Sequence, residues 1–219
     1  MENNILHNYS YSWNFYVTNN KFLDFKASND FNRWDKLKNT WYKTGVAFNK
    51  LDSLDGQVNT LWNTYMQHPS YDDFWKKMIP YKQEFAKIDI PILTITGYYD
   101  DSQRGAMYYY NQHHKYAKNP NHYLVVGPYD HWTAQTKPVE NFRNYKLDKS
   151  ALINIDEDLI YQWFDYILKG KKKPNILKDK VNFQVMNTNT WMHKPSLNAM
   201  TNDTLKFHLN ATKKDNFFF

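Results

Sequence analysis

Apolar residues recur at three- and four-residue intervals through the first part of the chain, which is the spacing of one face of a helix. Asp30 is a predicted N-cap and Gly45 a predicted stop, because short polar side chains and glycine are favoured at these two ends. The apolar positions between them are Phe31, Trp34, Leu37 and Trp41. The pattern predicts a second helix from about residue 54 to His68-Pro69 and a third, short helix opening at 71–75. Because strand-like alternation is missing, this part of the chain is predicted to be a helical subdomain.

The pattern changes at Ile88. Residues 88–96 form a short, nearly continuous apolar and β-branched run closed by Gly97, and residues 122–126 form a second run closed by Gly127. Such runs are typical of strands buried on both faces. The polar stretch between them, 102–118, is compatible with a helix. Two buried strands about 30 residues apart with a helix between them predict a βαβ unit in a parallel sheet.

Two further features follow the predicted βαβ unit. Apolar residues at helical spacing predict a helix over 155–168, with Gly170 as its stop. Segments 181–185 and 205–209 instead alternate between apolar and polar residues and are separated by Asn- and Thr-rich turns. Alternation of this kind favours strands with one solvated face, so these segments predict the start of an antiparallel β domain.

Composition narrows the classes of protein that this chain can be. Its 219 residues are 42% hydrophobic, which is enough to bury a core, and no long uncharged apolar run predicts a membrane span. The absence of cysteine removes disulfides, thiolate metal sites and cysteine nucleophiles. The net charge of +6 is mostly lysine spread along the chain, and its one run, 169–173, is short and lacks interleaved aromatics. We therefore expect a solvated loop there and no nucleic-acid partner.

Candidate chemistry follows the two buried strands. Asp100 comes three residues after Gly97, and His131 comes four residues after Gly127. In an open α/β sheet, functional groups gather at the carboxyl ends of strands, so the two side chains are expected to meet. A carboxylate that accepts the imidazole Nδ1 proton fixes the tautomer and turns Nε2 toward a substrate, as in the acid and base of a serine-hydrolase triad. The alternative is a turn aspartate and a loop histidine with no shared role.

Five motifs carry a resemblance to a known family. They are HPSYDDFW at 68–75, IPIL at 90–93 leading into GYYD at 97–100, GPYDH at 127–131, WFDYILKG at 163–170 and VNFQVM at 181–186. In this order they resemble the cocaine-esterase-type (CocE/NonD) family of α/β-hydrolases, relatives of α-amino-acid ester hydrolases, glutaryl acylases and X-Pro dipeptidyl peptidases. The resemblance implies that Asp100 is the triad acid and His131 the base. Tyr98 and Tyr129 stand where the family more often has tryptophan.

The resemblance implies an α/β fold: residues 1–87 a helical cap subdomain, 88–178 the C-terminal part of an α/β-hydrolase core, and 179–219 the beginning of a jelly-roll β domain. A hydrolase of this fold uses a serine in a Gly-x-Ser-x-Gly elbow, and none of the serines of this chain has glycines at that spacing. In the family this elbow precedes the cap. We therefore expect the chain to be a portion of a serine hydrolase that cleaves carboxylic esters or acyl amides, and to be inactive alone.

The resemblance implies a small-molecule ester or amide substrate, with no metal and no organic cofactor. The adjacent His113 and His114 are expected to be surface polar residues, and His68 and Asp72 are expected to cap and orient the third helix. Residues 1–7 lack the basic and apolar regions of a secretory signal, and exported and cytoplasmic locations both remain open. The sequence is compatible with a homo-oligomer. The alternative function is a noncatalytic module that binds carbohydrate or peptide.

Overall fold

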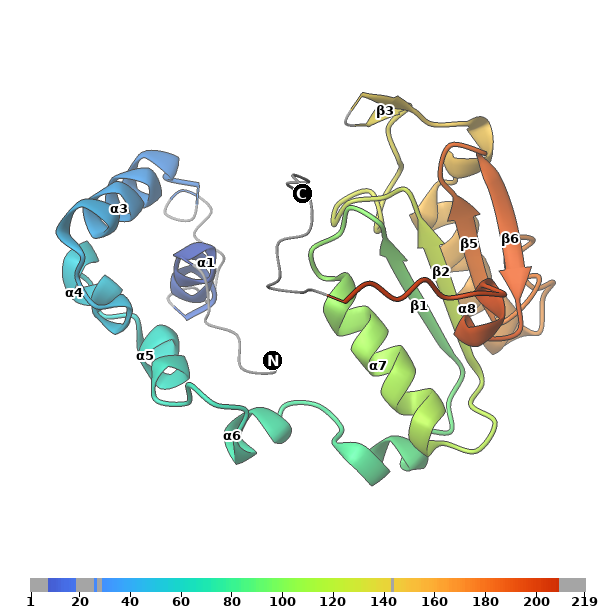
Figure 1. Ribbon diagram of the computed structural model, residues 1–219, viewed down its shortest axis with the longest axis horizontal. Coiled ribbons are helices and arrows are strands. Elements are labelled where there is room, and N and C mark those ends of the chain that lie inside the picture. Colours follow the sequence, from blue (N-terminus) through green and yellow to red (C-terminus); the bar gives the residue numbers. More distant parts are fainter. Residues whose placement is uncertain (1–7, 19–25, 27–28, 143, 209–219) are drawn as a thin grey trace. The chain divides into compact units, whose positions relative to one another are not determined.

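The computed structural model describes residues 8–18, 26, 29–142 and 144–208. The chain separates into two compact units, Met1–Tyr81 and Lys82–Phe219. Each unit has its own hydrophobic core. Figure 1 shows the helices and strands of both units.

Within its described residues, the regular elements of the first unit are all helices, joined by turns and loops. Its helices are α1 (Asn8–Thr18), α3 (Phe31–Thr44), the short 3₁₀ turn η1 (Phe48–Lys50), α4 (Leu51–Asp55), α5 (Thr60–Met66) and α6 (Asp73–Lys76). Its core is built from Tyr11, Leu37, Leu51 and Trp62. Tyr11 and Trp62 meet edge to face, with ring centroids 5.4 Å apart.

Helix α3 begins and ends where the sequence predicts. The Asp30 side chain accepts a hydrogen bond from the Arg33 N–H at 3.0 Å, which satisfies one of the free donors of the first turn. At the other end Gly45 adopts a left-handed conformation, φ 63°, and its N–H donates to the Trp41 carbonyl. The predicted caps are confirmed.

The single helix predicted from about residue 54 to His68 is wrong, because two helices occupy this region. Gly56, at φ 76°, ends α4 with a left-handed residue. The Asn59 side chain then accepts from the Trp62 N–H at 3.1 Å and starts α5. A stop and a cap only three residues apart outweigh the apolar periodicity that runs across them.

A buried ion pair joins three helices of this unit. Arg33 of α3 donates from Nε and Nη2 to the two carboxylate oxygens of Asp55, at 2.9 and 2.6 Å. The Tyr11 hydroxyl of α1 donates to the same carboxylate at 2.9 Å. Because the Asp55 side chain is only 4% exposed, these partners replace the hydrogen bonds to water that its carboxylate gives up on folding.

The second unit is built on a four-stranded sheet with the order β1-β2-β5-β6. The strands are β1 (Ile92–Gly97), β2 (His122–Gly127), β5 (Val181–Val185) and β6 (Thr190–Lys194). Strand β1 runs parallel to β2, with α7 (Gln103–Tyr116) between them in the sequence. The predicted βαβ unit is therefore present. The 3₁₀ helix η2 (Lys82–Lys87) precedes β1, and a two-residue hairpin, β3 (Asn141–Phe142) with β4 (Tyr145–Lys146), follows β2.

Strand β2 is apolar from Tyr123 to Val126, and helices pack on both faces of the sheet (Figure 1). Tyr123 and Val125 face a core that includes Trp163 of α8 (Gln162–Lys169). Leu124, which points to the opposite face, packs with Tyr110 of α7. The continuous apolar run is thus explained by burial on two sides.

The helix predicted over 155–168 is present, with an irregular first half. Residues Ile155–Tyr161 are π-helical and lead directly into α8, which Gly170 ends at φ 65°. Two further short 3₁₀ helices are Lys149–Ala151 (η3) and Leu197–Met200 (η5). None of the helices in the described residues is long and apolar enough to cross a membrane.

The two segments predicted to begin an antiparallel domain behave differently. Strand β5 pairs antiparallel with β6 and also parallel with β2, so it continues the central sheet. Residues 205–208 form no strand, and residue 209 lies outside the described residues. Leu205 is 80% exposed and Phe207 is 89% exposed. Alternation produces a strand only where a neighbouring strand satisfies the backbone, and the described residues place none beside this segment.

Candidate active site

The loops that leave β1 and β2 are joined by their backbones. Gly97 is the register partner of Gly127. Beyond the strands, the Tyr98 N–H donates to the Gly127 carbonyl and the Tyr99 N–H donates to the Tyr129 carbonyl, both at 3.0 Å. A Cβ atom on Gly97 would collide with the backbone of Tyr129, and one on Gly127 would collide with its ring. Two glycines therefore allow the close approach of the loops that carry the candidate residues.

The structure brings Asp100 and His131 together at this edge of the sheet. His131 Nδ1 lies 3.3 Å from Asp100 Oδ1. The Asp100 side chain is 8% exposed, and it also accepts from the Ser102 N–H at 2.9 Å and from the Thr96 hydroxyl at 3.4 Å. Because a carboxylate only accepts, the proton of this contact belongs to Nδ1 of the imidazole. The His131 side chain is 50% exposed, so the neutral ring offers Nε2 as a free base.

Asp130 organises the turn that presents His131. Its Oδ1 accepts from the Trp132 N–H at 3.1 Å, the Thr133 N–H at 2.9 Å and the Thr133 hydroxyl at 2.8 Å. The Gln135 side chain closes the same turn by donating to the His131 carbonyl at 2.6 Å. Asp130 is thus a turn-forming residue, and its carboxylate is engaged by the backbone.

A buried tyrosine, Tyr129, and a half-buried one, Tyr98, connect the two loops to neighbouring elements. The Tyr129 hydroxyl donates to the Ala151 carbonyl at 3.0 Å, and burial raises the pKa of this phenol. The Tyr98 hydroxyl donates to the Gln184 carbonyl on β5 at 2.5 Å, and burial raises its pKa also. Both phenols stay protonated at neutral pH and act as hydrogen-bond donors. The aromatic residues at these two positions therefore tie the Asp100 and His131 loops to neighbouring elements.

One group of three side chains in the described residues has ligand atoms close enough to share a cation. Asp100, Asp101 and His131 each offer an atom within 4.8 Å of the others. Two of these three residues already form the Asp100–His131 hydrogen bond. A cation at this place would compete with that bond, so the arrangement supports an acid–imidazole pair better than a metal centre.

The expectation that His113 lies at the surface is wrong. His113 is fully buried on the inner face of α7, and its Nδ1 lies 3.0 Å from Nδ1 of His122 on β2. Its Nε2 lies 3.2 Å from the Ile88 carbonyl, and His122 Nε2 lies 2.7 Å from the Thr94 hydroxyl. His122, which sequence reasoning missed, is buried at the start of β2, away from the carboxyl edge of the sheet.

A second acid–imidazole contact lies in the first unit. His68 Nδ1 is 2.7 Å from Asp72 Oδ2, while Asp72 Oδ1 accepts from the Phe74 N–H at 3.0 Å. The His68 ring stacks on Phe74, with centroids 4.1 Å apart, and its carbonyl accepts from Trp75 Nε1. The hydrogen bond with His68 lowers the pKa of Asp72, so the cap stays ionised. The predicted role of His68 and Asp72 in capping and orienting α6 is confirmed.

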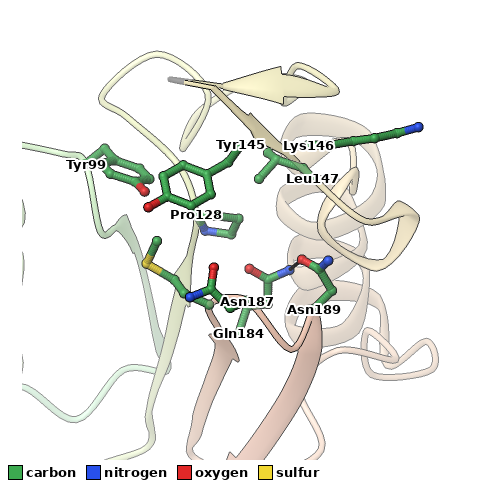
Figure 2. A pocket seen from close by; sticks show the side chains of 9 residues that line it. Tyr99, Pro128, Tyr145, Lys146, Leu147, Gln184, Asn187 and Asn189 are labelled. Carbon is green, nitrogen blue, oxygen red and sulfur yellow. Dashed lines mark hydrogen bonds between the residues drawn. The ribbon is translucent and has the colours of Figure 1, made fainter.

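A pocket of about 160 Å³ lies at the carboxyl edge of the sheet, and Figure 2 shows the side chains that line it. Tyr99, the neighbour of Asp100, and Pro128, in the His131 loop, form part of its wall. The β4 strand and the β5–β6 turn form the rest. Sequence reasoning missed this pocket, because its walls come from segments far apart in the chain.

The fold is a mixed sheet with helices that is similar to solved hydrolases. One is an α-amino acid ester hydrolase, with a TM-score of 0.55 and 21% sequence identity over 68% of this chain. Another is an aminopeptidase of a marine sediment Thaumarchaeota archaeon, with a TM-score of 0.52 and 16% identity over 72% of this chain. The chain spans about a quarter of each, 24% and 26%.

The X-Pro dipeptidyl-peptidase family (S15 family) matches residues 4–133, more than half of the chain. The chain belongs to this family of hydrolases, which confirms the resemblance to the cocaine-esterase type. No curated protein matches it. The matched residues include both Asp100 and His131.

Proposed function

We propose that this chain supplies the acid and the base of a serine hydrolase that cleaves carboxylic esters or acyl amides. Asp100 orients the imidazole, and His131 transfers the proton. The observation that carries the proposal is the 3.3 Å contact between His131 Nδ1 and a buried Asp100 carboxylate at the carboxyl edge of a parallel sheet. Membership of the X-Pro dipeptidyl-peptidase family supports the same reaction class.

The proposed reaction proceeds through an acyl-enzyme. His131 Nε2 removes the hydroxyl proton of a serine as the serine oxygen attacks the substrate carbonyl carbon. The imidazolium, stabilised by Asp100, then gives this proton to the departing alcohol or amine as the tetrahedral intermediate collapses. Water repeats the sequence on the acyl-serine and releases the acid. No step requires a metal or an organic cofactor.

The serine nucleophile is proposed to come from outside these 219 residues. The chain contains no Gly-x-Ser-x-Gly elbow, and the amide that follows such a serine forms part of the oxyanion hole. Without these groups nothing forms or stabilises the tetrahedral intermediate. The isolated chain is therefore proposed to be inactive.

The domain assignment belongs to the same proposal. Residues 1–87 would be the helical cap, 88–178 the C-terminal part of the α/β core, and 179–219 the beginning of a jelly-roll domain. The helices of the first unit support the cap assignment, while β5 and β6 belong to the same sheet as β1 and β2. A small-molecule ester or amide is the substrate class that the family suggests.

Labelling with a fluorophosphonate, which reacts with activated serines, tests the proposal. The isolated chain should stay unlabelled. A protein that joins it to the nucleophile-bearing segment of an S15-family hydrolase should be labelled, and His131→Gln should abolish the labelling. Asp101→Asn is a matched control, since it alters an exposed carboxylate beside Asp100 and should leave labelling unchanged. Labelling of the isolated chain, or labelling that persists in His131→Gln, would contradict the proposal.

A further inference from the structure

The pocket at the carboxyl edge of the sheet has two walls of different chemistry. Figure 2 shows the carboxamides of Gln184, Asn187 and Asn189 on one side of the pocket and the rings of Tyr99 and Tyr145 on the other. The remaining lining residues are Pro128, Lys146, Leu147 and Met186. Carboxamides offer both donors and acceptors, and phenol rings offer flat apolar faces with one polar tip.

The pocket carries no countercharge for a charged ligand. Lys146 is its one ionisable lining residue besides the tyrosines, and its side chain extends away from the pocket (Figure 2). The Lys146 ammonium lies 3.7 Å from the Glu140 carboxylate, and its side chain is 77% exposed. A carboxylate or ammonium that entered the pocket would lose hydration without meeting an opposite charge, which is unfavourable.

The carboxamide wall is held in place by the turn that bears it. Asn187 and Asn189 have φ angles of 66° and 53°, the left-handed region that asparagine tolerates better than most residues. The Asn189 carbonyl accepts from the Ser150 hydroxyl at 2.9 Å, and its side-chain oxygen lies 3.5 Å from Nε2 of the buried Gln184. Because the turn is fixed by these contacts, the amide groups are positioned before any ligand arrives.

Hydrogen-bonding groups at the rim are available to a ligand. Within the described part of the chain, the Tyr145 hydroxyl and the Asn187 side chain have no protein partner for a hydrogen bond, and the Tyr145 ring is 46% exposed. A planar group with one donor and one acceptor could therefore bond to the carboxamides and to the phenol while its faces contact the rings.

We propose that this pocket is a subsite for an uncharged amide group of the substrate, such as a peptide unit or a primary carboxamide. Its place as a substrate subsite rests on the proposed hydrolase function, because Tyr99 and Pro128 lie in the two loops that carry the candidate acid and base. The binding of the amide does not depend on catalysis. It can be measured on the isolated 219-residue chain.

The test is a titration of the ¹⁵N-labelled chain, followed by NMR, with three small probes of similar shape. N-methylacetamide has a donor and an acceptor, methyl acetate lacks the donor, and acetate is charged. The side-chain NH₂ resonances of Gln184, Asn187 and Asn189 should shift and saturate with N-methylacetamide, with a dissociation constant on the order of 10 mM for so small a ligand. Methyl acetate should bind several-fold more weakly, and acetate should give no saturable shift.

Two variants, one in the pocket and one outside it, make the test specific. Tyr145→Phe removes one hydroxyl and should weaken the binding of N-methylacetamide by about three- to tenfold, which is the effect of one hydrogen bond. Tyr161→Phe removes the same hydroxyl from an exposed tyrosine that does not line the pocket, and it should leave the affinity unchanged. Absence of saturable shifts, equal responses to acetate and the amide, or equal effects of the two variants would overturn the amide site.

The outcome is separable from that of the proposed function. If the chain binds the amide but the joined protein does not react with fluorophosphonate, the hydrolase function is wrong. The pocket is then not a substrate subsite. Fluorophosphonate labelling without amide binding would overturn the subsite alone.

Discussion

His113 Nδ1 and His122 Nδ1 face each other at 3.0 Å inside the second unit, and their contacts fix both tautomers. The Ile88 carbonyl can only accept, so a neutral His113 carries its proton on Nε2 and its Nδ1 must accept. His122 therefore donates from Nδ1, and its Nε2 accepts from the Thr94 hydroxyl. This neutral chain links α7, β2, β1 and the segment before β1.

Acid should weaken the second unit through this histidine pair. Burial, and secondarily the electrostatic interaction with His113, lower the pKa of His122 to about 3, below its ordinary value of 6.5. His114 and the ammonium of Lys180 also lower the pKa of His122. The pKa of His114 is itself lowered, mainly by burial. Because the unfolded state binds the proton more readily, the stabilisation is complete above about pH 6.5 and is lost as the pH falls toward 3.

The measurement is the free energy of unfolding in urea at several pH values. Between pH 7 and pH 5 it should fall by about 1–2 kcal/mol from this cause. His122→Gln should flatten the dependence, whereas His208→Gln, at an exposed position, should leave it unchanged. A His122→Gln profile that follows the wild type would show that the pair does not control acid stability.

The buried carboxylate of Asp55 should be the main polar determinant of stability in the first unit. Asp55→Ala leaves the Arg33 guanidinium without its two acceptors and the Tyr11 hydroxyl without its partner, so it should cost about 3 kcal/mol. Asp35→Ala, which breaks an exposed pair with Lys38, should cost less than about 0.5 kcal/mol. Chemical denaturation measures the free energy of unfolding of both variants. Equal losses would show that the buried pair stabilises the unit no more than the exposed pair does.

The glycine that allows the two loops to meet should not tolerate a methyl group. Gly97→Ala places a Cβ against the backbone of Tyr129 and should lower the free energy of unfolding by about 2 kcal/mol or more. Gly105→Ala is the matched control, because open space surrounds this position within α7. It should raise stability by roughly 0.5–1 kcal/mol, since alanine favours the helix. Thermal unfolding compares the two, and a tolerated Gly97→Ala would contradict the described approach of the loops.

Local signals accounted for the parts of the fold that the sequence predicted correctly. Helix α3 was predictable because Asp30 and Gly45 act through their own neighbours in the chain. Strand β2 was predictable because burial on both faces leaves a continuous apolar run, and β1 has a similar run although residues 92–95 are only partly buried. The loops that bear Asp100 and His131 could also be predicted to lie together, because neighbouring parallel strands end at the same edge of the sheet.

The features that the sequence did not predict depend on contacts between distant segments. Nothing local distinguishes His113 from the adjacent His114, yet one is buried against β2. Segment 205–209 has the alternation of a strand, but only a neighbouring strand can turn that pattern into one. The amide pocket combines residues from four separate segments. Such features require the three-dimensional arrangement.

The tautomer of His131 tests the central claim most directly. If Asp100 holds this imidazole, ¹⁵N NMR of the neutral side chain should show the proton on Nδ1, with Nε2 free to act as a base. Asp100→Ala should shift the ring toward the Nε2–H form that a free imidazole prefers, and Asp101→Ala should not. A His131 ring that is already in the Nε2–H form in the unaltered chain, or that does not respond to Asp100→Ala, would contradict the account.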